Sequence, residues 1–278
     1  MRVTVDDLVF DVDVAGPEDG EAVLLLHGFP HSRESWTDIA PLLHRAGLRT
    51  VAPDQRGYSP GARPEAVEAY ALPELAADAL GVLDALGIEA AHVAGHDWGA
   101  VVGWYLAARF PGRVRSLTAA GFPHLDAFRH ALRVDHRQRL HSGYIDTLSA
   151  EDAADTFLAD GAAGLEGWYR QTEGVLSEEQ IERYMRTHTS PGTLRAALKW
   201  YRAGSLQDDS DPLGPVTVPT THIWSENDPA VGVLAAERTA DHVTGEYRFV
   251  RLRGVSHWQP QQVPEKVAAE ILDRVRGA

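Results

Sequence analysis

The sequence predicts an α/β protein with a mostly parallel sheet, helices on both faces of the sheet and a helical insertion near the middle of the chain. Short apolar runs typical of buried strands alternate with segments whose apolar residues recur at helical spacing. This alternation stops between about residues 123 and 215, where helical patterns follow one another without a clear strand pattern. Because that stretch is too long for a loop, we expect a helical domain over one edge of the sheet.

The elements of the sheet follow from the apolar patterns, taken in chain order. Strands are predicted as a hairpin over 2–14 and then at 22–26, 50–52, 91–94, 114–120, 220–224 and 247–252. Helices are predicted between and after them at 73–86, 100–110, 231–243 and 264–275. In the insertion, helical patterns cover 131–140, 150–158, 178–185 and 194–202. We therefore expect a core domain made of residues 1–122 and 216–278, and a cap domain made of residues 123–215.

The composition excludes several classes of function. The chain of 278 residues has 26 basic and 40 acidic side chains, which give a net charge of −14, and it contains no cysteine. Disulfides, cysteine–metal sites and a thiol nucleophile are thereby excluded. The negative charge argues against a nucleic-acid partner, which requires a basic face. Neither a leader pattern nor an apolar run of about 18–20 residues is present, so we expect a cytoplasmic protein without a membrane partner.

The strongest local motif is Gly-His-Asp-Trp-Gly at residues 95–99, between a predicted strand and a predicted helix. This is the setting of a nucleophile elbow, here with Asp97 at the position of the nucleophile. The two glycines allow a sharp turn and a close approach of strand and helix. At a helix N-terminus, backbone N–H groups and the helix dipole favour an ionised carboxylate. The alternative is that Asp97 only caps the helix.

A histidine and an acidic residue follow the elbow in the order typical of a hydrolase triad. His257 lies in a loop after the last predicted strand, where a general base would be placed. Asp228, after the preceding strand, is the candidate to orient His257 and to stabilise its charged form. Glu226 and the more distant Asp126 are the alternatives for this acid.

The segment His-Gly-Phe-Pro at residues 27–30 follows the first buried strand. A turn at this place can direct backbone N–H groups toward the space above Asp97. We expect the N–H groups of Phe29 and Trp98 to form an oxyanion hole there. An ordinary turn at the end of a strand is the alternative interpretation.

With these motifs, the chain resembles the α/β-hydrolases, in the epoxide hydrolase branch that is related to the haloalkane dehalogenases. The resemblance extends from the turn at 27–30 through the elbow at 95–99 to Ser-His-Trp at 256–258. It implies an α/β-hydrolase fold, with an eight-stranded, mostly parallel sheet and a helical cap.

The resemblance also implies two cap tyrosines that hydrogen-bond the epoxide oxygen. Tyr201 lies in Lys-Trp-Tyr-Arg, which matches the family's Asn-Trp-Tyr-Arg at three positions. Tyr144 ends a Gln-(x)₃-Ser-x-Tyr segment similar to the family's second motif. Tyr169 and Tyr184 compete with Tyr144 for this role, because a cap tyrosine can equally serve packing.

The predicted activity is the opening of an epoxide to a vicinal diol through a covalent ester on Asp97, which water activated by His257 and Asp228 then hydrolyses. No cofactor and no metal is required. A haloalkane dehalogenase with the same triad and a non-catalytic ligand-binding member of the fold are the alternatives.

The expected ligand is a small, apolar, neutral epoxide. We expect the substrate pocket to include His27, Pro30, Trp200 and Trp258. The sequence leaves the oligomeric state and the physiological substrate undetermined.

Overall fold

A computed structural model describes residues 1–172 and 174–278, and its central feature is an eight-stranded sheet. The strands are β1 (Arg2–Val5), β2 (Leu8–Ala15), β3 (Ala22–Leu26), β4 (Arg49–Pro53), β5 (Ala91–His96), β6 (Val114–Ala120), β7 (Thr220–Ser225) and β8 (Tyr247–Leu252). Their order in the sheet is β1-β2-β4-β3-β5-β6-β7-β8. Strand β2 pairs antiparallel with β1 and β4, and every other pairing is parallel, so the predicted, mostly parallel sheet is confirmed.

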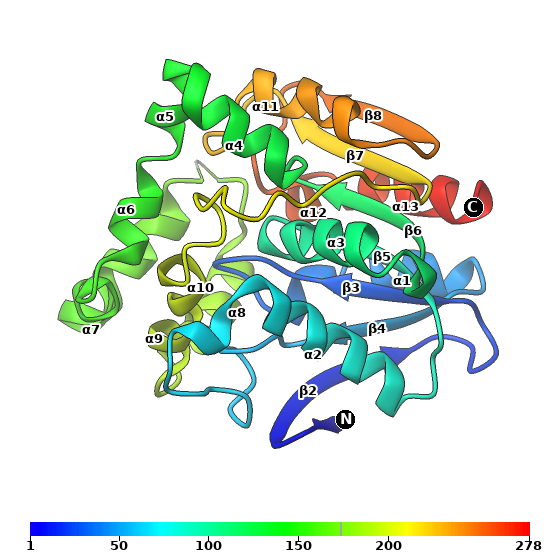
Figure 1. The fold of residues 1–278 in the computed structure, drawn as a ribbon. Helices are drawn as coiled ribbons and strands as arrows, with labels where there is room; N and C mark the ends of the chain where they lie inside the picture. The colour runs from blue at the N-terminus through cyan, green and yellow to red at the C-terminus, as the bar shows by residue number, and fades with distance from the viewer. Residues whose placement is uncertain (173) are drawn as a thin grey trace.

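Helices cover both faces of the sheet. The core helices are α1 (Ala40–Arg45), α2 (Leu72–Ala85), α3 (Trp98–Arg109), α11 (Val233–Arg238), α12 (Gln259–Gln262) and α13 (Pro264–Arg276). Figure 1 shows α2 and α3 in front of the sheet, with α1 and α13 behind it. The sequence of β3 is apolar throughout because both faces of the strand are buried. Leu24 and Leu26 pack in one hydrophobic cluster, and Leu25 packs in the cluster on the opposite face.

The insertion forms a group of helices at one end of the sheet, at the left of Figure 1. These helices are α4 (Leu125–Val134), α5 (His136–His141), α6 (Tyr144–Ser149), α7 (Ala153–Arg170), α8 (Glu178–Thr189), α9 (Thr193–Ala197) and α10 (Lys199–Arg202). Among the described residues, no helix combines the length and the hydrophobicity that crossing a bilayer requires.

The boundaries of the cap helices differ from those predicted by the sequence. The helix predicted at 131–140 is interrupted at Asp135, whose backbone is extended and whose carboxylate accepts the N–H of Arg137 to begin α5. The helix predicted at 150–158 is present as the first part of α7, which begins at Ala153 and loses helical backbone angles at 159–162. The helical segment that follows, up to Arg170, and α6 were not predicted. Short helices separated by single capping residues have too few turns for a clear periodic pattern.

Candidate active site

Asp97 lies on a tight turn between β5 and α3, at the carboxyl end of the central strands. Its φ of +54° is in a region that side chains other than glycine rarely adopt, so the turn is held by its surroundings. A Cβ atom at Gly95 would overlap the carbonyl oxygen of Gly99, and one at Gly99 would overlap that of Leu26. Both glycines of the motif therefore permit the close strand–helix contact that projects Asp97 above the sheet.

His257 lies between two carboxylates. Its Nδ1 atom is 2.8 Å from Oδ2 of Asp228, and its Nε2 atom is 3.5 Å from Oδ2 of Asp97. The second oxygen of Asp228 accepts the backbone N–H groups of Ala230 and Val231, which fix the carboxylate in place. The three side chains predicted to act together are thus in one group, and all three are buried.

The two alternative acids have other partners. Glu226 accepts a 2.7 Å hydrogen bond from Arg251, and Asp126 accepts backbone N–H groups of residues 213 and 214. Among the three acids considered, only Asp228 bonds to the imidazole. The sequence alone does not separate Asp228 from Glu226 and Asp126, because the role depends on which carboxylate the fold places beside the imidazole ring.

His257 and Asp97 are both charged at neutral pH. Burial disfavours the imidazolium form of His257, but Asp228 and Asp97 outweigh burial and raise its pKa to about 10. Burial also disfavours the Asp97 carboxylate, but His257, with a smaller contribution from the N–H of Trp98, outweighs it and lowers the pKa of Asp97. At neutral pH the site therefore holds an ionised nucleophile beside a protonated histidine.

Of the two N–H groups predicted to form an oxyanion hole, that of Phe29 donates to Oδ1 of Asp97 over 2.8 Å. The N–H of Trp98 contributes to the lowered pKa of the same carboxylate. A Cβ atom at residue 28 would overlap Asp97, so Gly28 permits the close approach of the turn. Oδ1 is consequently held by the backbone N–H of Phe29, and Oδ2 lies on the side of His257.

A cavity of about 610 Å³ opens above Asp97, between the sheet and the cap. Tyr144 from α6 and Tyr201 from α10 both line it, with ring centroids 6.2 Å apart. Burial raises the pKa of both phenols well above the usual value, so that both remain protonated. The ring of Tyr201 also packs edge-to-face against the indole of Trp98, with centroids 5.3 Å apart.

The two rival tyrosines are engaged elsewhere and do not line this cavity. The hydroxyl of Tyr169 donates to the carbonyl of Pro30 over 2.6 Å, and it also lies 3.1 Å from His188. The hydroxyl of Tyr184 accepts a 2.8 Å hydrogen bond from Gln261. The contact with Pro30 connects a cap helix with a loop of the core, and the contact with Gln261 connects a cap helix with α12 of the core.

Two of the four pocket residues predicted from the sequence lie outside the cavity. Pro30 and Trp258 line it, but His27 and Trp200 do not. The ring of His27 accepts the N–H of Gln55 behind the elbow, and the indole of Trp200 donates to a backbone carbonyl of the loop after β4. Hydrogen bonds with loops of the core hold both side chains outside the cavity, so the prediction that His27 and Trp200 line the pocket is wrong.

Several lining residues carry no motif and were missed by sequence reasoning. They come from the cap and from the loop after β7: Leu140, His141, Leu148, Trp168, Gln171, Thr172, Pro229 and Ala230. No local pattern distinguishes them from packing residues, since only the folding of the cap brings them together.

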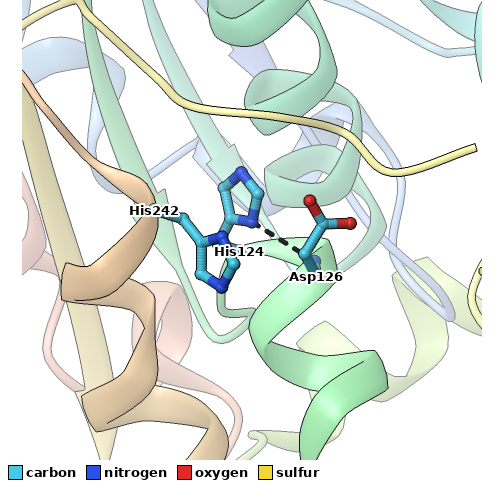
Figure 2. A group of neighbouring side chains, drawn as sticks. All are labelled: His124, Asp126 and His242. Atoms are coloured by element: carbon cyan, nitrogen blue, oxygen red, sulfur yellow. Dashed lines mark hydrogen bonds between the residues drawn. The ribbon is translucent and has the colours of Figure 1, made fainter.

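Outside this cavity, His124, Asp126 and His242 place possible metal ligand atoms within 4.8 Å of one another (Figure 2). Both ring nitrogens of His124 are already engaged, one by the N–H of Asp126 and the other by the carbonyl of Gly214. The two imidazoles are stacked, with centroids 4.5 Å apart and planes within 1°. A metal lies near the plane of each ring that binds it, so parallel stacked rings cannot share one ion in this arrangement. His124 and Asp126 instead hydrogen-bond to residues 213 and 214, which connects the first residues of the cap with its last residues.

Comparisons with known proteins agree with this geometry. A family model described as "alpha/beta hydrolase fold" matches residues 21–260. The AB hydrolase superfamily protein YfhM of Bacillus subtilis is 31% identical over 281 residues, covering 99% of this chain and 96% of the relative. Epoxide hydrolase A of Mycobacterium tuberculosis is 31% identical over 299 residues, covering 95% and 92%. The crystal structure of Bacillus megaterium epoxide hydrolase in complex with an inhibitor aligns with a TM-score of 0.90 at 25% identity, covering 99% of this chain and all of that one.

Proposed function

Because the chain belongs to the α/β-hydrolase family and is an enzyme of the epoxide hydrolase type, we propose that it opens a neutral epoxide to a vicinal diol through an ester on Asp97. The observation that carries this proposal is the arrangement around one cavity. The carboxylate of Asp97 has His257 on one side, and two protonated phenols, Tyr144 and Tyr201, line the same space.

In the first step, Oδ2 of Asp97 attacks an epoxide carbon, and the carbon–oxygen bond of the ring breaks. Tyr144 and Tyr201 donate hydrogen bonds to the developing alkoxide, which is a poor leaving group without such donors. The alkoxide gains a proton and becomes a hydroxyl group. Esterification removes the negative charge of Asp97, which lowers the pKa of His257. The imidazolium of His257 therefore loses the proton that the alkoxide gains.

In the second step, neutral His257 takes a proton from water, which attacks the carbonyl carbon of the ester. The N–H groups of Phe29 and Trp98 stabilise the oxyanion at the position that Oδ1 occupies in the free enzyme. The bond between the carbonyl carbon and the alkoxy oxygen then breaks, and this oxygen takes up the remaining proton of the attacking water. The diol leaves, and the site returns to ionised Asp97 beside protonated His257. Asp228 holds the imidazole in place and stabilises its charge in both steps.

Haloalkane dehalogenation would use the same nucleophile and base. It has no need for the two protonated phenols, Tyr144 and Tyr201, that line the cavity. A pure ligand-binding protein has no need for the contacts that place His257 between Asp97 and Asp228. These observations favour the epoxide.

A single-turnover reaction in ¹⁸O-water tests the proposal. The new oxygen of the first diol should be unlabelled, because it comes from Asp97, and label should enter the enzyme first. Full labelling of the diol in that first turnover would exclude the covalent route. Halide release from bromoalkanes, with no diol from any epoxide, would instead assign the site to dehalogenation.

A further inference from the structure

The loop that carries Asp228 joins β7 to α11 and consists of residues 226–232, here called the acid loop. Oδ1 of Asp228 accepts the N–H groups of Ala230 and Val231, over 2.8 and 3.1 Å. Its other oxygen bonds to His257. Backbone donors can hold a carboxylate in place only if the backbone that carries them is itself fixed. The position of the acid therefore depends on what binds the rest of the acid loop.

Three further backbone groups of the acid loop bind side chains. The carbonyl of Val231 accepts the indole N–H of Trp224, a residue of β7, over 2.9 Å. The carbonyl of Ala230 and the N–H of Gly232 both bind Gln138 of α5, each over 2.8 Å. One side chain of the cap thus supplies two of these three contacts.

The amide of Gln138 is fully buried and fully used. Its NH₂ group donates to Ala230 and to the hydroxyl oxygen of Ser142, and its oxygen accepts the N–H of Gly232. A carbonyl can only accept and an N–H can only donate, so these two groups of the acid loop require a donor and an acceptor together. An amide offers both without a charge, and an added charge here would disturb the balance between the imidazolium and its carboxylates.

We propose that Gln138 is a positioning residue, which acts through the acid loop to fix the carboxylate of Asp228 against His257. The inference rests on the proposed function and deepens it, because the cap then supports the acid of the core in addition to supplying the two tyrosines. Gln138 itself does not line the cavity. It opens the Gln-(x)₃-Ser-x-Tyr segment that ends in Tyr144, so one short segment serves both the acid and a proton donor.

The first test is Gln138→Met, which keeps a similar length but removes both the donor and the acceptor. Single-turnover kinetics separates formation of the ester on Asp97 from its hydrolysis. Hydrolysis should slow by about tenfold to a hundredfold, as expected for a small displacement of a group that supports catalysis. Gln138→Asn keeps a buried amide on a shorter side chain that does not reach the acid loop, so it should show a similar decrease. Hydrolysis at the unmodified rate in both variants would overturn the proposal.

Gln261→Met is the matched control. Gln261 also joins the core to the cap, but its amide donates to the hydroxyl of Tyr184 on α8, away from the acid loop. This variant should keep the hydrolysis rate of the unmodified enzyme. An equal decrease in Gln138→Met and Gln261→Met would mean that any loosening of the cap slows the reaction, which contradicts a specific role of Gln138.

A double variant tests whether Gln138 acts through the acid. In an Asp228→Asn background the carboxylate is already absent, so Gln138→Met should slow hydrolysis by a much smaller factor than it does in the unmodified enzyme. The same factor in both backgrounds would show that the two residues act independently, and the proposal would be wrong.

Proton NMR tests the positioning without a substrate. The proton on Nδ1 of His257, which is hydrogen-bonded to Asp228, should give a far-downfield resonance. Gln138→Met should shift or broaden this resonance, and Gln261→Met should leave it unchanged. If no epoxide forms an ester but this difference is seen, the positioning role stands and the proposed reaction fails. If the ester forms and is hydrolysed, but neither the resonance nor the hydrolysis rate responds to Gln138→Met, the reaction stands and the positioning role is wrong.

Discussion

The Nδ1 atom of His257 lies 2.8 Å from Oδ2 of Asp228, while the second oxygen of Asp228 is held by two backbone N–H groups. This arrangement predicts the effect of Asp228→Asn. The amide oxygen of asparagine can keep the backbone hydrogen bonds, but its NH₂ group then faces Nδ1 and favours the wrong tautomer of the imidazole. We expect kcat for diol formation to fall by about 10²–10⁴-fold, with the ester on Asp97 accumulating as added mass on the protein.

Glu226→Gln is the matched control for this variant. Glu226 lies two residues before Asp228 in the same loop, and it pairs with Arg251 rather than with the imidazole. It should retain kcat within about twofold, since an ion pair at the surface contributes little. A comparable loss in both variants would mean that the loop, and not the carboxylate of Asp228, supports the reaction.

The raised pKa of His257 predicts how stability depends on pH. The folded protein holds this proton with a pKa of about 10, against an ordinary value of 6.5 in the unfolded chain. The resulting stabilisation is fully present below pH 6.5 and is lost as the pH rises through about 10. Thermal unfolding should therefore show a Tm that falls over this range, and His257→Gln should flatten the fall. A decline of equal size in the variant would assign it to other groups.

The tyrosines are predicted to separate into two classes. Tyr144→Phe and Tyr201→Phe remove donors that line the cavity, so each should slow formation of the ester by about 10²-fold or more in rapid-mixing experiments. Tyr169→Phe removes a buried hydrogen bond to Pro30 and should lower the free energy of unfolding by about 1 kcal/mol. Its rate of ester formation should be nearly unchanged. If Tyr169→Phe abolished ester formation and Tyr144→Phe did not, the second cap tyrosine would have to be reassigned.

Gly28→Ala should damage the reaction more than the fold. The added Cβ would overlap both the carboxylate and the Cβ of Asp97, so the turn at Gly28 must move away from the elbow, and that movement breaks the hydrogen bond from the N–H of Phe29. Loss of one such donor typically costs about 10²–10³-fold in kcat. Circular dichroism should show a folded protein, and Gly112→Ala, where a Cβ would meet no atom, is the control for the substitution itself.

The family and the centre of the site followed from local sequence patterns. A strand buried on both faces must be apolar throughout, as in β3, and a sharp strand-to-helix turn requires glycine, as at Gly95 and Gly99. These requirements fall on residues that are adjacent in the chain, so they leave visible motifs. The resemblance to α/β-hydrolases that rested on these motifs is confirmed by the family match over residues 21–260.

The tertiary structure decided what depends on contacts between distant segments. His27 and Trp200 were assigned to the pocket, yet hydrogen bonds to loops of the core hold them outside it. Trp168, Gln171 and Thr172 belong to no motif, and only the packing of the cap places them on one cavity. The sequence by itself therefore determined the sheet, the elbow and the order of the acid and the base, because local backbone geometry imposes them. The pocket was decided by how the cap folds over the sheet, because burial and hydrogen bonding there join residues that no local pattern connects.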